Sequence, residues 1–95
     1  MVRILRSLVQ VTTSVGGRLT GYTRHGLHQA ISREGAGVSP RAILDAVQNP
    51  QQVIQRAGGI TEYVGEVARV HLNRVGQVVT VIATSRRGFR IPGGG

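Results

Sequence analysis

The chain contains a short stretch, Tyr22 to Arg33 (YTRHGLHQAISR), in which residues capable of acid–base chemistry recur at helical spacing. At about 100° per residue, its apolar members gather on one side of a helix and its polar members on the other. Such a polar face is either a solvated helix surface or a site for a negatively charged substrate. Its members are His25, His28, Gln29, Ser32 and Arg33.

Cleavage of RNA through its own 2′-hydroxyl is one reaction that such residues could perform. It needs one group that takes a proton from the 2′-hydroxyl and another that protonates the leaving 5′-oxygen. Histidine suits both steps because its ordinary pKa lies near neutrality, and arginine can stabilise charge on the phosphoryl oxygens. A metal-free set could be drawn from His25, His28, Gln29, Arg33, Arg69, His71 and Thr80.

Each of these residues also has an ordinary structural interpretation. His25 and His28, three apart, could be surface residues or half of a metal site, but the chain has no Cys and only four acidic residues to complete one. His71 and Thr80 suit a plain strand, and Arg33 suits a solvated helix end. The case for a site therefore depends on co-occurrence, and we expect neither a metal nor another cofactor.

The net charge points to a polyanionic partner. The chain has 95 residues, which favours one domain, and 12 basic residues against four acidic ones, for a net charge of +8. All 12 basic residues are Arg, whose planar fork of donors matches phosphate. A GC-rich coding bias would also favour Arg over Lys. The charge favours nucleic acid, an anionic membrane surface or an acidic protein as partner.

Two further compositional features limit the function classes. Only three aromatic residues occur, fewer than a single-strand binder that stacks bases would need. No apolar run is long enough to span a membrane, and residues 1–17 lack the apolar core of a signal peptide. If the protein acts outside its cell, another part must carry it there.

The first half of the sequence reads as helical. Val2 to Val15 has roughly helical spacing, although Val9 to Val15 could also be extended. Thr23 to Glu34 reads as a helix capped by Thr23 and stopped by the glycines that follow. Ser39 to Asn49 is the clearest helix, with Ser39 as N-cap, Pro40 at the first position and a stop at Asn49-Pro50.

After Pro50 the period becomes alternating. Four strands are expected, at Gln52–Arg56, Ile60–Val64, Val67–Asn73 and Gln77–Thr84, with a basic, glycine-rich tail after them. Helices followed by a meander indicate an α+β fold, with N-terminal helices packed on a twisted antiparallel sheet of about four strands.

The last hairpin predicts a register. A loop of two or four residues sets Asn73 level with Gly76 and Arg69 level with Thr80. Arg69, His71 and Thr80 would then share the face away from the helices. The face that packs on the helices would carry Ala68, Val70, Leu72, Val79, Val81 and Ala83.

Two stretches carry a resemblance to a known family: GYTRHGLHQAISREGAGVSPRAILDAVQNP and EYVGEVARVHLNRVGQVVT. Together they cover roughly residues 21–88. They resemble the C-terminal toxin domains of bacterial polymorphic toxins, such as contact-dependent inhibition and Rhs-type effectors. The family pattern falls on Thr23, His25, Gly26, Gln29, Ile31, Arg33, Gly37 to Ser39, Ile43 to Pro50, Tyr63 to Gly65 and Val78 to Thr80.

The resemblance implies a barnase/EndoU/colicin/RelE-like fold and a metal-independent ribonuclease, often one that cuts tRNA. It makes His25 a general base or acid and Arg33 the group that stabilises the scissile phosphate, with Gln29 and Thr80 positioning it. His28 is a further catalytic candidate, at a position where relatives have Asn, and His71 is not part of the pattern. The expected RNA-binding residues are Arg24, Arg69, His71, Arg86, Arg87 and Arg90.

We therefore expect a single toxin domain over residues 1–95, with a helical lead-in at 1–20, a catalytic core at 21–88 and a flexible tail at 89–95. Its expected partners are RNA, chiefly tRNA, and an acidic immunity protein. It would be delivered as the C-terminal part of a larger secreted effector and act in the target-cell cytoplasm. The alternative is a non-catalytic RelE/ParE-like toxin or a nucleic-acid-binding module.

Overall fold

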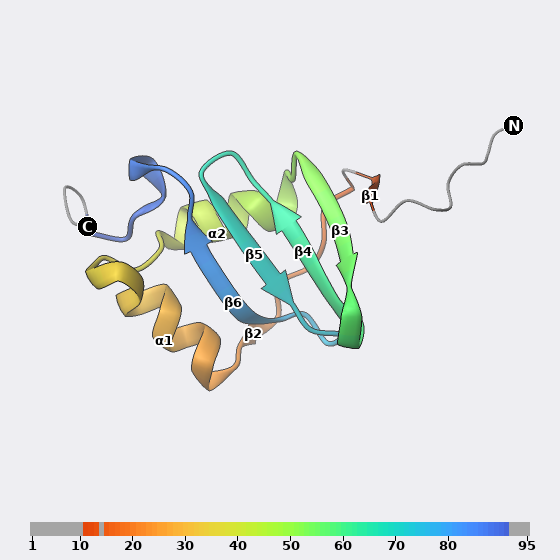
Figure 1. Cartoon of the computed structure of the whole chain (residues 1–95), viewed down its shortest axis with the longest axis horizontal. Coiled ribbons are helices and arrows are strands. Elements are labelled where there is room, and N and C mark those ends of the chain that lie inside the picture. Colours follow the sequence, from red (N-terminus) through yellow and green to blue (C-terminus); the bar gives the residue numbers. More distant parts are fainter. Residues whose placement is uncertain (1–10, 14, 92–95) are drawn as a thin grey trace, which may run out of the picture.

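A computed structural model describes residues 11–13 and 15–91 as two helices beside one mixed sheet (Figure 1). The sheet order is β1-β3-β4-β5-β6-β2, antiparallel throughout except between β2 and β6. The predicted α+β class is confirmed, and the predicted four-stranded meander forms the centre of the sheet. The elements are β1 (Val11–Thr13), β2 (Gly21–Tyr22), α1 (Arg24–Ser32), α2 (Pro40–Gln48), β3 (Gln52–Arg56), β4 (Ile60–Val64), β5 (Ala68–Leu72) and β6 (Gln77–Ala83).

Both predicted helices begin at the capping residues that the sequence indicates. The Thr23 hydroxyl accepts a hydrogen bond from the Gly26 N–H at 3.0 Å, and the Ser39 hydroxyl accepts one from the Ala42 N–H at 3.3 Å. α1 ends two residues earlier than expected. The chain then tightens into a 3₁₀ turn that contains Glu34 at φ 56°.

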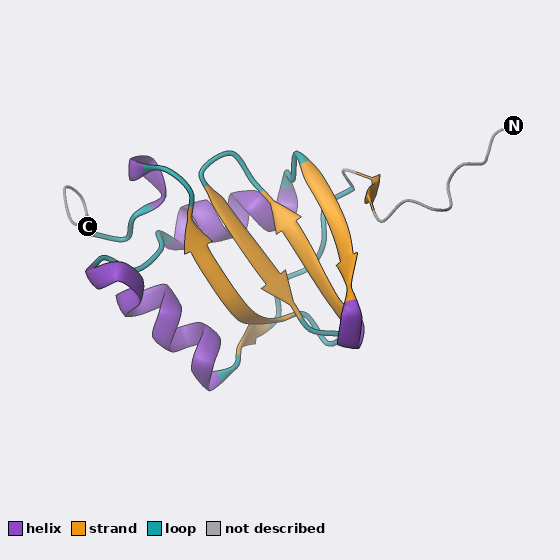
Figure 2. Cartoon of the chain, in the orientation of Figure 1, coloured by secondary structure: helices purple, strands orange, loops and turns teal. Residues whose placement is uncertain are grey.

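α2 covers one face of the sheet and builds the core with it (Figure 2). Its buried residues lie at the spacing of one helical face and pack on alternate residues of β5 and β6. The helix side of this core consists of Ala42, Ile43, Ala46 and Val47. The sheet side includes Ala68, Val70, Leu72, Val78 and Val81.

α1 lies alongside β6 (Figure 1), and the two backbones come close at Gly26. A Cβ on Gly26 would overlap the carbonyl oxygen of Val78. Glycine at this position therefore lets the helix and strand backbones meet. The same Val78 carbonyl accepts hydrogen bonds from the Thr23 N–H at 3.0 Å and the Thr23 hydroxyl at 3.1 Å.

The predicted register of the last hairpin is wrong, because its loop has three residues. Asn73 pairs with Gln77 across Arg74 to Gly76, and Gly76 takes φ 90°. A bulge at Val79 then returns the following residues of β6 to their predicted sides of the sheet, with His71 paired to Thr80 and Arg69 to Ile82. Val78 occupies the core position predicted for Val79.

The bulge also explains which parts of that prediction are confirmed. Residues beyond it return to the predicted face, so Val81 is buried and Ala83 packs against the core. On β5, Ala68, Val70 and Leu72 are buried as predicted. Arg69, His71 and Thr80 share the opposite face.

The two ends of the described chain differ from the predictions. Of the predicted helical lead-in, residues 1–10 and 14 lie outside the described residues, Val11–Thr13 is a strand and residues 15–20 form no helix. Of the predicted flexible tail at 89–95, Phe89 bridges to Val38, Arg90 and Ile91 donate backbone hydrogen bonds to Gly37 and Ala36, and residues 92–95 lie outside the described residues. Just before it, residues 86–88 form a 3₁₀ turn. The described helices include none long and apolar enough to cross a membrane.

Candidate nucleic-acid interface

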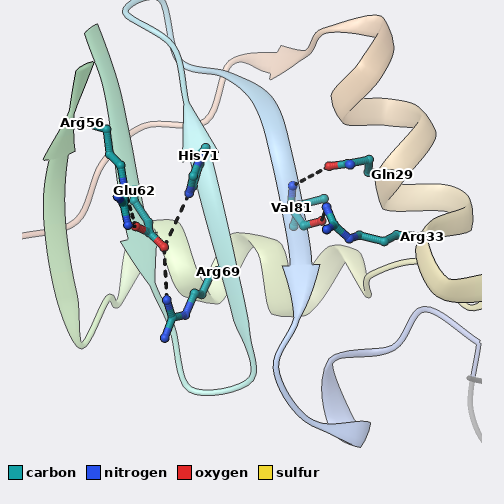
Figure 3. Close-up of polar contacts among 7 residues, drawn as sticks. All are labelled: Gln29, Arg33, Arg56, Glu62, Arg69, His71 and Val81. Carbon is teal, nitrogen blue, oxygen red and sulfur yellow. Dashed lines mark hydrogen bonds and ion pairs between the residues drawn. The ribbon is translucent and has the colours of Figure 1, made fainter. Parts of the chain in front are cut away.

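The sheet surface that faces away from α2, here called the open face, carries Glu62, Arg69 and His71 (Figure 3). Thr80, which pairs with His71, lies on the same face. Glu62 on β4 pairs with His71 on β5, which pairs with Thr80 on β6. Directly paired residues have their Cβ atoms about 5 Å apart. The three side chains therefore form one row across the strands.

Glu62 is the one charged residue that is buried in the described chain, with 2% exposure. Arg56 reaches it from β3, with Nε and Nη2 donating to Oε1 at 2.8 and 2.5 Å. The second carboxylate oxygen, Oε2, lies 3.6 Å from Arg69 Nη1 and 3.5 Å from His71 Nε2. Figure 3 shows these three side chains converging on the carboxylate from the two neighbouring strands.

The surroundings of Glu62 favour its ionised form. Burial alone raises the pKa of this carboxyl. The hydrogen bond from Arg56, the positive charge of Arg56 and the contact with His71 act in the opposite direction and outweigh burial. The pKa of Glu62 is therefore lowered from its ordinary value, and the group is a carboxylate near neutral pH.

Gln29 on α1 and Arg33, which directly follows α1, bind the outer edge of β6 (Figure 3). Gln29 Oε1 accepts from the Val81 N–H at 3.2 Å, and Arg33 Nη1 donates to the Val81 carbonyl at 3.4 Å. β2 pairs only with Gln77 and Val78, so it leaves the edge at Val81 without a partner strand. These two side chains therefore satisfy backbone groups that an edge strand would otherwise expose.

His25 belongs to the same helical row as Gln29 and Arg33. Residues four apart lie above one another on a helix, so the three side chains follow one line along β6. His25 is exposed, and within the described chain neither His25 nor His28 has a side-chain hydrogen bond. Thr80 directly precedes Val81, so the row on α1 and the row on the sheet meet at β6.

Other expected site residues lie outside these two rows. His28 and Arg24 are exposed and lie roughly 100° and 140° around α1 from Gln29. Three more arginines belong to the C-terminal segment beyond β6. Among them, Arg86 is exposed, Arg87 pairs with Glu66 at 3.1 Å, and Arg90 Nε donates to the Ile31 carbonyl at 3.0 Å.

The described residues also form a cavity away from the open face. A cavity of about 510 Å³ lies at the β3–β4 and β5–β6 turns, and Arg18, Tyr63 and Arg74 are among the residues that line it. None of the sequence-predicted site residues lines this cavity. Within residues 11–13 and 15–91, no group of three or more His, Asp or Glu side chains is placed to hold a metal ion.

Sequence reasoning missed Glu62 and Arg56. The signal was available for Glu62, because a short β4–β5 hairpin through Gly65 to Val67 sets Glu62 opposite His71. A lone acidic residue between Ile60 and Val64 on a half-buried strand also calls for a partner. Arg56 could be found only from the pairing of β3 with β4.

Comparison with known proteins shows what the chain is similar to. The chain is 50% identical over 70 residues to a segment of the tRNA nuclease WapA of Bacillus subtilis (strain 168). The matched region covers 73% of this chain and 3% of that relative, so the chain spans a small part of the protein that it matches. No protein-family description and no solved structure matches the chain.

Proposed function

We propose that this domain is an antibacterial toxin domain that acts as a metal-independent endoribonuclease on tRNA. The observation that carries the proposal is the 50% identity over 70 residues to a tRNA nuclease. The arrangement of the site supports it, because the row of His25, Gln29 and Arg33 adjoins an open face that carries Arg69 and His71. Imidazole and guanidinium groups are suited to proton transfer and phosphate binding without a metal.

The proposed reaction is attack of a ribose 2′-oxygen on the adjacent phosphorus. A base removes the 2′-hydroxyl proton as the 2′-O–P bond forms. The P–O5′ bond breaks, and an acid protonates the leaving 5′-oxygen. The products are a 2′,3′-cyclic phosphate and a 5′-hydroxyl, with no oxidant or co-reactant required.

The residues are assigned to these steps by position. His25 performs one proton transfer, and His28, whose Cβ is about 5–6 Å away at the i, i+3 position, performs the other. Arg33 uses one N–H on Val81, and the remaining donors of its guanidinium stabilise the phosphoryl oxygens. Gln29 and Thr80 position the phosphate. The Oε1 atom of Gln29 accepts from Val81, which leaves the amide N–H₂ to donate to the phosphate.

The test is incubation of the purified domain with total bacterial RNA in excess EDTA, followed by a denaturing gel. The wild type is expected to give discrete tRNA fragments with cyclic phosphate ends. His25→Ala should reduce the cleavage rate at least a hundredfold, within the range that a general acid or base contributes, and keep the wild-type fold by circular dichroism.

Arg41→Gln serves as the control, because Arg41 is exposed on α2, on the far side of the sheet. It should cleave as the wild type does. Intact RNA that is retarded on a native gel would reject the ribonuclease and favour the non-catalytic binding module. Cleavage that requires added Mg²⁺ would reject metal independence.

We also propose that the domain is part of a larger effector that is delivered into a target cell. In the producing cell, a cognate acidic immunity protein neutralises it. The net charge of +8 and the small share of the relative that the chain covers support this proposal. Expression of the domain alone should arrest growth, and co-expression of the immunity protein should restore it. Growth arrest that persists with every acidic protein encoded beside the effector would contradict the immunity partner.

A further inference from the structure

Burial of the Glu62 carboxylate costs free energy, so its presence on the open face needs an explanation. A buried carboxylate loses its hydration, and even a well-paired ion seldom stabilises a fold more than apolar side chains of similar size would. The row that contains Glu62 starts from Ile54 on β3, so an apolar residue would suit this sheet position. Stability alone therefore does not account for the carboxylate.

The carboxylate orients three side chains that are themselves accessible. Arg56 and Arg69 are 49% and 51% exposed, and His71 is 28% exposed, while Glu62 beneath them is 2% exposed. Arg56 contacts Oε1, and Arg69 and His71 contact Oε2. Each guanidinium has five N–H donors, so most of them remain available on the solvent side.

The cluster has an excess of positive charge. Two guanidinium groups face one carboxylate, so it is positive even when the imidazole of His71 is neutral. Preorganised guanidinium groups bind the two free oxygens of a phosphodiester as a matching pair of acceptors. Glu62 lowers the cost of binding, because the side chains are already held in place.

We propose that Glu62 is the positioning residue of a phosphate subsite in which Arg56, Arg69 and His71 bind a backbone phosphodiester of RNA. Arg56 and Glu62 have no role in the proposed cleavage, so this assignment adds residues to it. The subsite adjoins Thr80 through His71 in the same row. Under the proposed function, which this last step presupposes, the bound phosphate is a neighbour of the scissile one.

The test measures binding of a synthetic tRNA stem–loop that is 2′-O-methylated at every ribose. This probe keeps the phosphodiesters but lacks the attacking hydroxyl, so binding is measured without cleavage. Glu62→Gln makes the protein more positive, and general charge attraction would tighten binding. The subsite predicts about tenfold weaker binding, since a neutral amide cannot hold both arginines.

Matched variants separate position from charge. Glu66→Gln makes the same charge change at a side chain that is 63% exposed, and its binding should be equal to or tighter than that of the wild type. Arg56→Gln and Arg69→Gln should each weaken binding about tenfold, whereas Arg41→Gln should change it less than about twofold. If Glu62→Gln does not fold, the two open-face arginine variants decide the matter.

Two results would overturn the subsite. One is binding by folded Glu62→Gln that is as tight as that of Glu66→Gln. The other is a loss in Arg56→Gln and Arg69→Gln that is no larger than in Arg41→Gln. With unmodified tRNA, Arg69→Gln should raise KM about tenfold and leave kcat within about threefold, because a flanking phosphate is bound equally in the ground and transition states.

The same measurements distinguish failure of the subsite from failure of the proposed function. In one outcome, the wild-type protein binds the probe through Glu62 and the two arginines but never cuts unmodified tRNA. This result would reject the ribonuclease proposal and support the subsite. Cleavage that is lost in His25→Ala, combined with unchanged probe binding in the Glu62 and arginine variants, would reject the subsite and keep the ribonuclease.

Discussion

The Glu62 carboxylate makes the stability of the domain depend on pH at acid values. Its pKa in the folded chain is lowered from the ordinary value of 4.5, because Arg56 and His71 outweigh the effect of burial. Stabilisation from such a group is fully present above its unfolded-state pKa. It is lost as the pH falls through the lower folded-state pKa, where the buried carboxylate takes up a proton.

Thermal unfolding between about pH 6 and pH 3 tests this linkage. The wild-type Tm should fall as the pH decreases below about 4.5. At pH 6, Glu62→Gln should have a lower Tm and a free energy of unfolding that is smaller by about 1–3 kcal/mol. Its Tm should also fall less steeply toward pH 3. Glu66→Gln, at an exposed position, should keep the wild-type slope. Parallel curves for the wild type and Glu62→Gln would show that Glu62 is not the group responsible.

Gln29 is expected to serve both the fold and the substrate, and two substitutions separate the roles. Gln29→Ala removes the acceptor of the Val81 N–H and should cost about 1 kcal/mol of stability as well as activity. Gln29→Glu keeps an acceptor at the same place but sets a negative charge beside the proposed phosphate. It should unfold near the wild-type Tm and lose at least tenfold in tRNA cleavage.

Chemical denaturation and initial cleavage rates of the two Gln29 variants measure these effects. Arg41→Gln, on the opposite side of the sheet, should leave both quantities unchanged. Full activity in Gln29→Glu would remove Gln29 from the proposed site and leave it a purely structural residue on the edge of β6.

At the scale of the elements, the parts of the fold that depend on local chemistry could be predicted from the sequence. Thr23 and Ser39 place the helix starts, and the alternating pattern after Pro50 gives the four long strands. The bulge at Val79 could not be found this way, because Val78 and Val79 are chemically identical in the pattern. Only packing of Val78 against the core distinguishes them.

The candidate site was predictable to a similar degree. Helical spacing brings His25, Gln29 and Arg33 into one row without tertiary information. The sequence does not show that this row lies against β6, where Gln29 and Arg33 bind Val81. This placement depends on how the helix docks beside an edge strand. The role of Glu62 depends on pairing three strands in register, which no local pattern specifies.

Docking of α1 on β6 gives a prediction at this scale. Gly26→Ala should raise intrinsic helix propensity by up to about 1 kcal/mol, yet its Cβ would overlap the Val78 carbonyl. Backbone cannot yield as a flexible side chain does, so we expect a net loss of about 1–3 kcal/mol and impaired cleavage. Displacement of the helix would also separate Gln29 and Arg33 from Val81.

Gly21→Ala is the matched control, because a Cβ at Gly21 meets no atom within 4 Å. It should unfold within about 0.5 kcal/mol of the wild type in chemical denaturation. Gly26→Ala that is more stable than the wild type would show that α1 does not sit against β6 as described.

At the scale of the whole molecule, the net charge of +8 attracts any polyanion, and its distribution decides where RNA lies. Arginines occur on the open face at Arg56 and Arg69, and also beside the cavity at Arg18 and Arg74. Attraction by total charge alone treats these pairs alike. If RNA follows a defined path across the open face, the two pairs differ, because only arginines that contact phosphate release counterions.

Two double variants with equal charge loss separate these cases. Binding of the 2′-O-methylated stem–loop is measured as the dependence of log Kd on log salt concentration. Arg56→Gln with Arg69→Gln should weaken binding and reduce the slope by about two units, about one for each lost phosphate contact. Arg18→Gln with Arg74→Gln should retain the wild-type slope and nearly the wild-type affinity. Equal losses in the two double variants would mean that the charge acts as a whole, and a larger loss at Arg18 and Arg74 would move the RNA path to the cavity between the two turns.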